Sequence, residues 1–188
     1  MGRASKAEAA QHREDVVHAT AKLLRERGSA SISVQDAMAA AGLTHGGFYK
    51  HFASKDELMG IAATEAFEDV LNQLVHLAED PDKPHARAQL VRKYLSTQHR
   101  DSPGTGCANA ALAGDSAQAE SQSPLRKSYV EGMNKTLSFF TELESGADAR
   151  RQAIVDLATL VGALTLARAT GRTALSKEIL ETVKDSLQ

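Results

Sequence analysis

The fold is decided by the stretch from Ser33 to Lys55, which reads SVQDAMAAAGLTHGGFYKHFASK. The Ser33 hydroxyl can accept a hydrogen bond from a free backbone N–H and so begin a helix. Ala37 and Ala41 then lie on one face of that helix. Gly42 ends it, because only glycine enters the left-handed conformation at a helix C-terminus without steric cost. The first half of the stretch therefore predicts a short helix with one buried face.

The second half of the stretch predicts another short helix with an exposed, mostly polar side. Thr44 can cap it, and Phe48 and Phe52 lie four residues apart, so both face the same core. Paired glycines cost a helix roughly 1 kcal/mol each relative to alanine, a cost that is understandable where the backbone approaches a ligand or phosphate closely. A short helix of this kind can enter the major groove of DNA, which is the role of the second helix in a helix-turn-helix. The residues left on its outer side are His45, Gly46, Tyr49, Lys50 and His51.

The segment GLTHGGFYKHFASKDEL, from Gly42 to Leu58, resembles the recognition-helix signature of the tetracycline-repressor (TetR/AcrR) family of bacterial regulators. The resemblance covers about the first third of the chain, and the rest resembles the family only in length and helical character. It implies an all-α protein of about nine helices. Residues 1–55 would form a three-helix DNA-binding domain with the helix-turn-helix, and residues 56–188 a helical domain for effector binding and dimerisation.

The resemblance also implies which residues contact DNA. Tyr49, His51 and Lys55 match family positions that hydrogen-bond phosphates. Ser33 and Thr44 could each be a helix cap, a phosphate ligand or both. Lys50 is a further candidate for a phosphate contact. The positions that touch base edges or approach the backbone in family members are occupied here by His45, Gly46 and Gly47.

The distribution of charge fits this assignment. Residues 1–55 hold eight Lys/Arg against five Asp/Glu, whereas residues 56–188 hold fourteen against nineteen. Affinity for DNA comes largely from cations that displace counterions from phosphates, so a basic excess is expected at the helix-turn-helix; chance asymmetry is the alternative. Arg3 and Lys6, which precede the first helix, could reach a neighbouring groove or simply be solvated.

Apolar periodicity predicts that the rest of the chain is helical, without strands, repeats or low-complexity tracts. The first 30 residues form an amphipathic helix that ends at Gly28. Proline and glycine clusters separate the later helices, with a turn-rich loop from Asp101 to Gly106. These helices are expected at about residues 56–78, 86–98, 108–119, 124–146, 148–170 and 176–187.

The stretch from Ala153 to Ala169 is apolar on most faces and should be buried on most faces. It is either a central helix of one subunit or packed against a copy of itself. The resemblance implies the second, because the last two helices of each family member form a four-helix dimer interface. A two-fold dimer also spaces two recognition helices to read a palindrome. The residues expected at this interface are Leu157, Leu160, Val161, Leu164, Ile179, Leu180 and Val183.

An effector pocket between the helices of residues 56–188 is a further implication of the resemblance. Its effector would favour a dimer geometry that no longer matches successive grooves, with the fourth helix as the lever. Eight Phe/Tyr residues and no Trp argue against a large aromatic-lined site. The expected pocket residues, which could equally be ordinary packing residues, are Tyr94, Cys107, Asn109, Tyr129 and Met133.

The single cysteine has two interpretations. The segment GCANAALA from Gly106 is similar to one found in several family members. Cys107 lies at a predicted helix start, where a thiolate is favoured and could react with electrophiles or oxidants. Buried free cysteine is nevertheless common as an inert apolar residue. A thiol-based sensing repressor is therefore an alternative function.

Other kinds of chemistry find no support in the sequence. One cysteine excludes an internal disulfide and a cysteine-based metal cluster, and the histidines lack metal-ligand spacing. The triplet from His99 to Asp101 has no glycine-rich phosphate loop beside it, and no Gly-x-Ser-x-Gly elbow occurs. We therefore expect no enzyme, cofactor or metal.

No apolar run reaches the length of a membrane span, and the first residues lack the apolar core of a secretory signal, so we expect a cytoplasmic protein without a membrane partner. The sequence as a whole predicts a dimeric repressor that binds a double-stranded DNA operator and is released by a small-molecule effector. A helical ligand-binding protein without DNA function is the hypothesis from another class.

Overall fold

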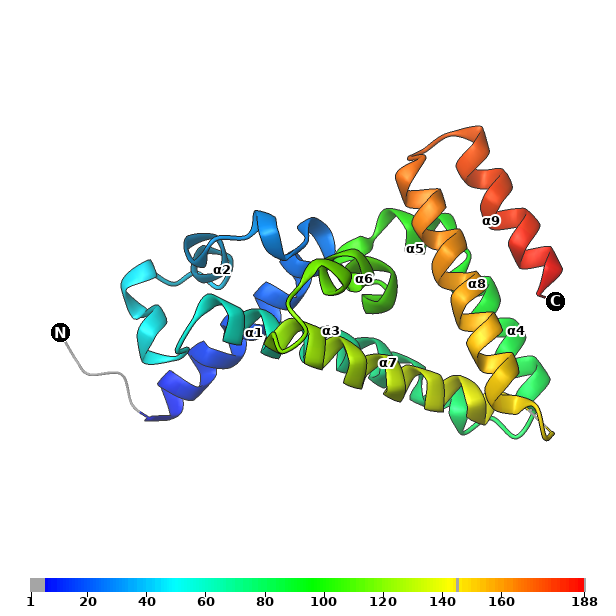
Figure 1. Cartoon of the computed structure of the whole chain (residues 1–188), viewed down its shortest axis with the longest axis horizontal. Helices are drawn as coiled ribbons and strands as arrows, with labels where there is room; N and C mark the ends of the chain where they lie inside the picture. Colours follow the sequence, from blue (N-terminus) through cyan, green and yellow to red (C-terminus); the bar gives the residue numbers. More distant parts are fainter. Residues whose placement is uncertain (1–5, 145, 188) are drawn as a thin grey trace.

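The computed structural model describes residues 6–144 and 146–187, so the expected role of Arg3 lies outside the described residues. The described chain is entirely helical, as predicted (Figure 1). Three short 3-10 helices accompany the α-helices: η1 (Ser29–Ser31), η2 (His45–Lys50) and η3 (Pro103–Thr105). The α-helices are α1 (Lys6–Arg27), α2 (Val34–Ala40), α3 (Lys55–Ala78), α4 (Lys83–Tyr94), α5 (Thr97–Asp101), α6 (Ala108–Gln118), α7 (Pro124–Leu143), α8 (Ala149–Ala169) and α9 (Ala174–Ser186).

Local sequence signals set the boundaries of the helix-turn-helix. Ser33 caps α2 in a capping box, in which its hydroxyl oxygen accepts from the backbone N–H of Asp36 at 3.1 Å. The Asp36 carboxylate accepts in return from the backbone N–H of Ser33 at 2.8 Å. Gly42 adopts a φ of 72°, which allows the sharp turn after α2. The predicted start and end of the first helix are both confirmed.

The second helix of the motif, η2, is a 3-10 helix. Thr44 occupies its N-cap position but makes no side-chain cap hydrogen bond, so of the two expected caps only Ser33 acts as one. The backbone N–H of His51 donates to the carbonyl oxygen of Phe48 at 2.9 Å, an i to i−3 bond. Paired glycines lower the propensity of this six-residue segment for an α-helix, in keeping with its short 3-10 form.

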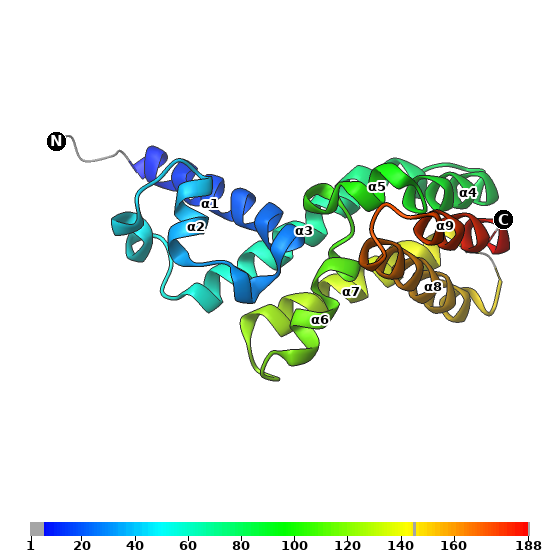
Figure 2. The ribbon, with the colours of Figure 1, turned by 90° about the horizontal axis from the view of Figure 1, so that it is seen from above.

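The molecule is elongated, with α1 and α2 at one end and α4, α8 and α9 at the other (Figure 2). Its buried apolar side chains form two hydrophobic clusters. The first joins α1, α2, η2 and the N-terminal half of α3, and α6 and α7 add Leu112 and Leu125 to it. The second joins α4, the C-terminal half of α7, α8 and α9. Helices α3 and α7, which pack against each other, contribute to both clusters and therefore connect the two ends of the chain.

Two glycines allow α3 and α7 to approach closely. A Cβ at Gly132 of α7 would collide with the ring of Phe67 of α3, and a Cβ at Gly60 of α3 would collide with Pro124 of α7. Dense packing of this kind leaves little space for sliding. The two long helices therefore form one continuous support for the cavity described below.

A part-buried ion-pair network joins helices of the C-terminal bundle. Arg87 of α4 pairs with Asp156 of α8, whose side chain is 2% exposed. The Nε of Arg87 also lies 2.9 Å from Oε1 of Glu144. Gln152 donates a further hydrogen bond of 2.8 Å to Asp156. The carboxylate of Asp156 is thus fully paired, as a buried charge must be.

Helix α8 is long and apolar enough to cross a membrane by length and composition, although the sequence analysis predicts no membrane span. In the structure it packs against α7 and α9, with Leu157, Leu160 and Leu164 buried in the chain's own core. It is therefore a helix of the folded bundle.

Candidate nucleic-acid interface and ligand cavity

The exposed side of η2 rests on a rigid aromatic base. Phe48 is fully buried and Phe52 is 2% exposed, so both are core residues, as predicted. The ring of Tyr49 packs edge-on against Phe48, with centroids 5.1 Å apart, yet Tyr49 is 74% exposed. An exposed tyrosine held in place by the core can present its hydroxyl to a partner with little loss of side-chain entropy.

Neither backbone strain nor steric crowding within the subunit requires the paired glycines of η2. Neither Gly46 nor Gly47 has a positive φ. A Cβ at Gly46 would meet nothing within 4 Å, and one at Gly47 would meet only Met38 in ordinary contact at 3.5 Å. Both positions would accept alanine without strain inside the subunit. Steric crowding within the described chain therefore does not account for the bare surface of η2.

The other expected DNA-binding residues flank this bare surface. The pKa of Asp36 is lowered first by hydrogen bonds from the Ser33 hydroxyl and backbone N–H, and more weakly by the charges of Arg27 and Lys55. Of the nine expected residues, six are exposed and three are partly exposed: Ser33, Thr44, His45, Gly46, Tyr49 and Lys50 in the first group, and Gly47, His51 and Lys55 in the second.

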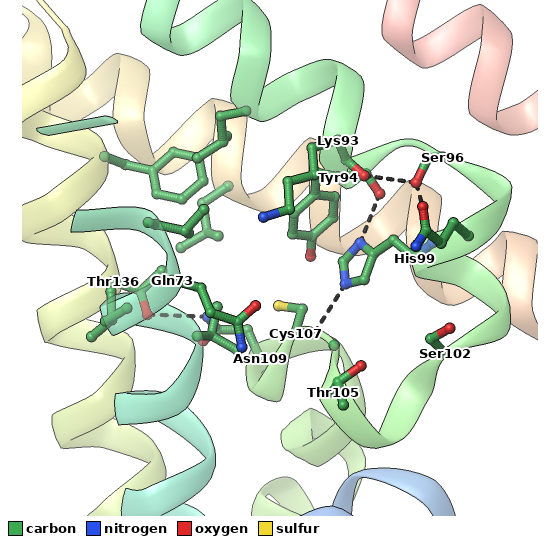
Figure 3. A pocket seen from close by; sticks show the side chains of 18 residues that line it. Gln73, Lys93, Tyr94, Ser96, His99, Ser102, Thr105, Cys107, Asn109 and Thr136 are labelled. Carbon is green, nitrogen blue, oxygen red and sulfur yellow. Dashed lines mark hydrogen bonds between the residues drawn. The ribbon is translucent and has the colours of Figure 1, made fainter. Parts of the chain in front are cut away.

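A cavity of about 250 Å³ lies in the other half of the chain (Figure 3). One wall is apolar and comes from α3, α4, α7 and α8. The other is polar and comes mainly from the connection between α4 and α6. The apolar wall includes Val70, Leu71, Leu74, Leu90, Phe140 and Leu157, and the polar wall includes Lys93, Tyr94, His99, Cys107, Asn109 and Thr136.

His99 holds the polar wall together. Its Nδ1 lies 2.8 Å from the carbonyl oxygen of Tyr94, and its Nε2 accepts from the backbone N–H of Cys107 at 3.1 Å (Figure 3). These partners require the neutral tautomer that carries its proton on Nδ1. Burial lowers the pKa of His99, and the charges of Arg168 and Lys93 act in the same direction. The imidazole is therefore a neutral bridge across the loop.

Of the five residues expected at the pocket, Tyr94, Cys107 and Asn109 line the cavity. Tyr129 and Met133 are partly buried on α7 and are not among its lining residues; the Tyr129 hydroxyl donates to the carbonyl oxygen of Asn109 at 3.4 Å. Sequence reasoning missed His99 and Thr136. The helix start that places His99 was visible in the sequence, because Ser96 caps α5 by accepting from the His99 backbone N–H at 3.1 Å.

The polar wall is also joined to the N-terminal helices. The backbone N–H of Ser29, just beyond α1, donates to Asp115 of α6 at 2.5 Å. Helix α6 begins at the cavity residue Cys107, its N-cap. A Cβ at Gly104 in η3 would collide with Glu26 of α1, so η3 lies directly on that helix. The elements that form the polar wall are thus in direct contact with the end of α1.

Comparison with known proteins identifies the family. The family model described as bacterial regulatory proteins, tetR family, matches residues 16–60. The HTH-type transcriptional repressor DhaR of Mycobacterium sp. (strain GP1) is 32% identical over 95 residues, which cover 50% of this chain and 47% of that protein. The chain belongs to the TetR family. The matched segment spans about half the length of DhaR.

Two solved structures share the fold of this chain over nearly its whole length. The reduced form of E. coli NemR superposes with a TM-score of 0.80 at 17% identity, covering 95% of each chain. A TetR transcriptional regulator from Chloroflexus aurantiacus J-10-FL superposes with a TM-score of 0.78 at 26% identity, covering 96% of this chain and 94% of that one. The TetR family consists of transcriptional regulators, in agreement with the prediction that the chain is not an enzyme.

The residues expected at a TetR-family dimer interface divide into two groups. Leu157, Leu160, Leu164 and Leu180 are at most 2% exposed inside the subunit's own core, out of reach of a second chain. The reason is that α8 packs against α7 and α9, which buries Leu157 and Leu160 of α8 together with Leu180 of α9 in one cluster. Val161, Ile179 and Val183 are partly buried against the same core. The large apolar side chains that α8 and α9 leave exposed are Ile154, Val155, Leu166 and Leu175.

Proposed function

We propose that this TetR-family protein is a transcriptional repressor that binds a palindromic operator in double-stranded DNA as a homodimer and acts in the cytoplasm. A small-molecule effector in the cavity releases it from the operator. Residues 1–55 serve as the DNA-binding domain, and residues 56–188 serve as the effector-binding and dimerisation domain. The observation that carries the proposal is the bare surface of η2 at Gly46 and Gly47.

This surface suits close contact with DNA. A side chain at Gly46 would stand in open space, so its absence helps only a partner that approaches the backbone. Tyr49, Lys50 and Lys55 supply hydroxyl and ammonium groups of the kind that position a protein on phosphates. The proposed DNA-contacting set comprises Ser33, Thr44, His45, Gly46, Gly47, Tyr49, Lys50, His51 and Lys55.

The experiment that tests the proposal begins with operator selection from a random DNA pool and then compares Gly46→Ala with the native protein. Alanine should leave the thermal midpoint unchanged or raised, because it favours helix and meets no neighbour. Operator affinity should fall on the order of tenfold, because an added methyl group displaces several phosphate contacts at once.

The matched control is Gly114→Ala. Gly114 is an exposed glycine of α6 with a non-positive φ, and a Cβ added to it would meet nothing within 4 Å, but it lies outside the proposed interface. This variant should bind the operator as the native protein does. Equal operator affinity of the two variants would refute the role of η2, and failure to select any DNA would leave a helical ligand-binding protein as the better account.

A second copy of the chain is proposed to pack on the exposed stripe of α8. Ile154 and Leu166 lie on this stripe, and Ala158 and Gly162 between them are small enough to let another helix approach. A Cβ at Gly162 would meet nothing within 4 Å of the subunit. An isologous interface of this kind presents two η2 surfaces to one DNA face.

A thiol-based sensor is the second candidate function, and the position of Cys107 favours it. The residue is 4% exposed and its thiol lies in the wall of the cavity, where a small electrophile or oxidant that entered would meet the sulfur (Figure 3). Replacement of Cys107 with serine should then abolish release from the operator by such reagents. Unchanged release from Cys107→Ser would remove this candidate.

A further inference from the structure

The polar wall of the cavity contains a side-chain amide with a fixed orientation. Thr136 donates its hydroxyl proton to the carbonyl oxygen of Gly132 at 2.9 Å, so its oxygen remains available only as an acceptor. The Nδ2 of Asn109 donates to that oxygen at 3.3 Å. The Oδ1 of Asn109 is therefore the amide atom left over, and it has no hydrogen-bond partner in the described chain although the residue is 3% exposed.

A second unpartnered group, the Tyr94 hydroxyl, lies in the same wall. It is shielded from solvent and faces the thiol of Cys107, a weak hydrogen-bonding group (Figure 3). Burial raises the pKa of Tyr94 well above its usual value, and the neighbouring Cys107 acts in the same direction. The phenol therefore keeps its proton and is able to donate it in a hydrogen bond.

The charges around the cavity limit the kind of molecule that fits. No Asp or Glu is among the described lining residues, and Lys93 is a cation at an exposed position of the wall. His99 is a neutral bridge with both ring nitrogens engaged. An organic cation would lose its hydration without gaining a carboxylate partner.

We propose that the effector is an uncharged molecule with a small apolar body and one polar end that both donates and accepts hydrogen bonds, such as a primary amide or an alcohol. This inference rests on the proposed effector role of the cavity. The polar end donates to Oδ1 of Asn109 and accepts from the hydroxyl of Tyr94. The apolar body lies against Leu71, Leu74 and Phe140. A cavity of about 250 Å³ is slightly smaller than pockets for drug-sized ligands, so single-ring molecules match it.

Four single-ring probes test the inference by calorimetric titration of the purified full chain. Benzamide donates and accepts, acetophenone only accepts, toluene does neither, and benzylammonium is a cation of similar size. Each satisfied hydrogen bond should tighten binding by about fivefold. Benzamide should therefore bind more tightly than acetophenone, acetophenone more tightly than toluene, and benzylammonium most weakly.

Tyr94→Phe removes only the proposed donor. It should weaken benzamide and acetophenone by about fivefold each and leave toluene unchanged. Its thermal midpoint should not fall, because the hydroxyl has no protein partner to lose. Tyr129→Phe is the matched control, since that hydroxyl bonds the backbone of Asn109 and does not line the cavity. It should bind all four probes as the native protein does.

The outcomes separate the inference from the proposed function. Equal binding of benzamide and toluene by the native protein, or an unchanged preference for benzamide over toluene in Tyr94→Phe, would overturn the inference while the cavity remained an effector site. Absence of binding by every probe, toluene included, would overturn both the inference and the effector role. Neither outcome bears on operator binding, which Gly46→Ala tests separately.

Discussion

The guanidinium of Arg25 in α1 donates a hydrogen bond of 2.7 Å to the carbonyl oxygen of Gly104 in η3. The same side chain, 3% exposed, donates to the carbonyl oxygen of Ala66 at 3.0 Å and to Asp69 at 2.9 Å. One residue thus joins the helix before the DNA-binding motif, the long helix α3 and the edge of the cavity. This arrangement gives the cavity a direct connection to α1 in addition to the one through α3.

Replacement of Arg25 with methionine should destabilise the protein by about 2 kcal/mol, because two buried carbonyl oxygens and a part-buried carboxylate lose their donor. Urea unfolding measures the change. Arg27→Met is the control, since Arg27 is an exposed arginine two residues further along the same helix. Equal stabilities of the two variants would show that the three bonds contribute nothing.

Lys55 should contribute to operator affinity through a phosphate contact. Lys55→Ala is expected to lower the slope of log affinity against log salt concentration by about one unit, because one fewer counterion is released. Lys127→Ala removes the same charge from an exposed position on α7 and should leave the slope unchanged. A common slope for the native protein and both variants would argue against the contact.

Acid should weaken the fold through His99. Its pKa is lowered from 6.5 in the folded chain, so below about pH 6.5 the unfolded chain binds more protons than the folded one. The contribution of neutral His99 to the free energy of unfolding is therefore fully present above this pH. It is lost as the pH drops towards the folded-state pKa.

His99→Asn isolates this effect from the other histidines. Unfolding free energies of the native protein and the variant, measured at about pH 7.5 and about pH 5.5 on either side of the ordinary histidine pKa, should show a smaller loss in the variant. An equal loss in both proteins would exclude His99 as the group responsible.

Dimer formation should depend on the exposed stripe of α8. Leu166 is 57% exposed in the subunit, and Leu166→Glu would place a charge in the proposed interface. Light scattering should report a dimer for the native protein and a monomer for this variant. Val130→Glu changes a 53% exposed side chain on α7 and should remain dimeric. A monomeric native protein would contradict the proposal at once.

Local signals made the helix-turn-helix predictable from sequence. The hydroxyl of Ser33, the left-handed glycine at position 42 and the spacing of Phe48 and Phe52 act within a few residues, so they can be read without knowledge of the fold. The break between α4 and α5 was missed although Ser96 marks it, because apolar periodicity runs on through Leu95.

The partner of each apolar face was much harder to predict. Leu157, Leu160 and Leu164 were expected at the interface because the family resemblance implies a dimer through the last two helices. Apolar periodicity does not tell which side of α8 meets the same chain. The cavity likewise depends on contacts between distant segments, such as that of Asn109 with Thr136. Such pairings are set by tertiary packing and leave no pattern within one helix.

The collision that a Cβ at Gly132 would make with Phe67 also bears on which changes the chain tolerates. A side chain at Gly132, or at Gly60 beside Pro124, would push α3 and α7 apart, so substitution at either position should destabilise the fold. Gly46 and Gly114 face open space and impose no such limit. Saturation mutagenesis scored separately for folding and for repression would therefore sort the glycines into those kept by the architecture and those kept by what the protein touches.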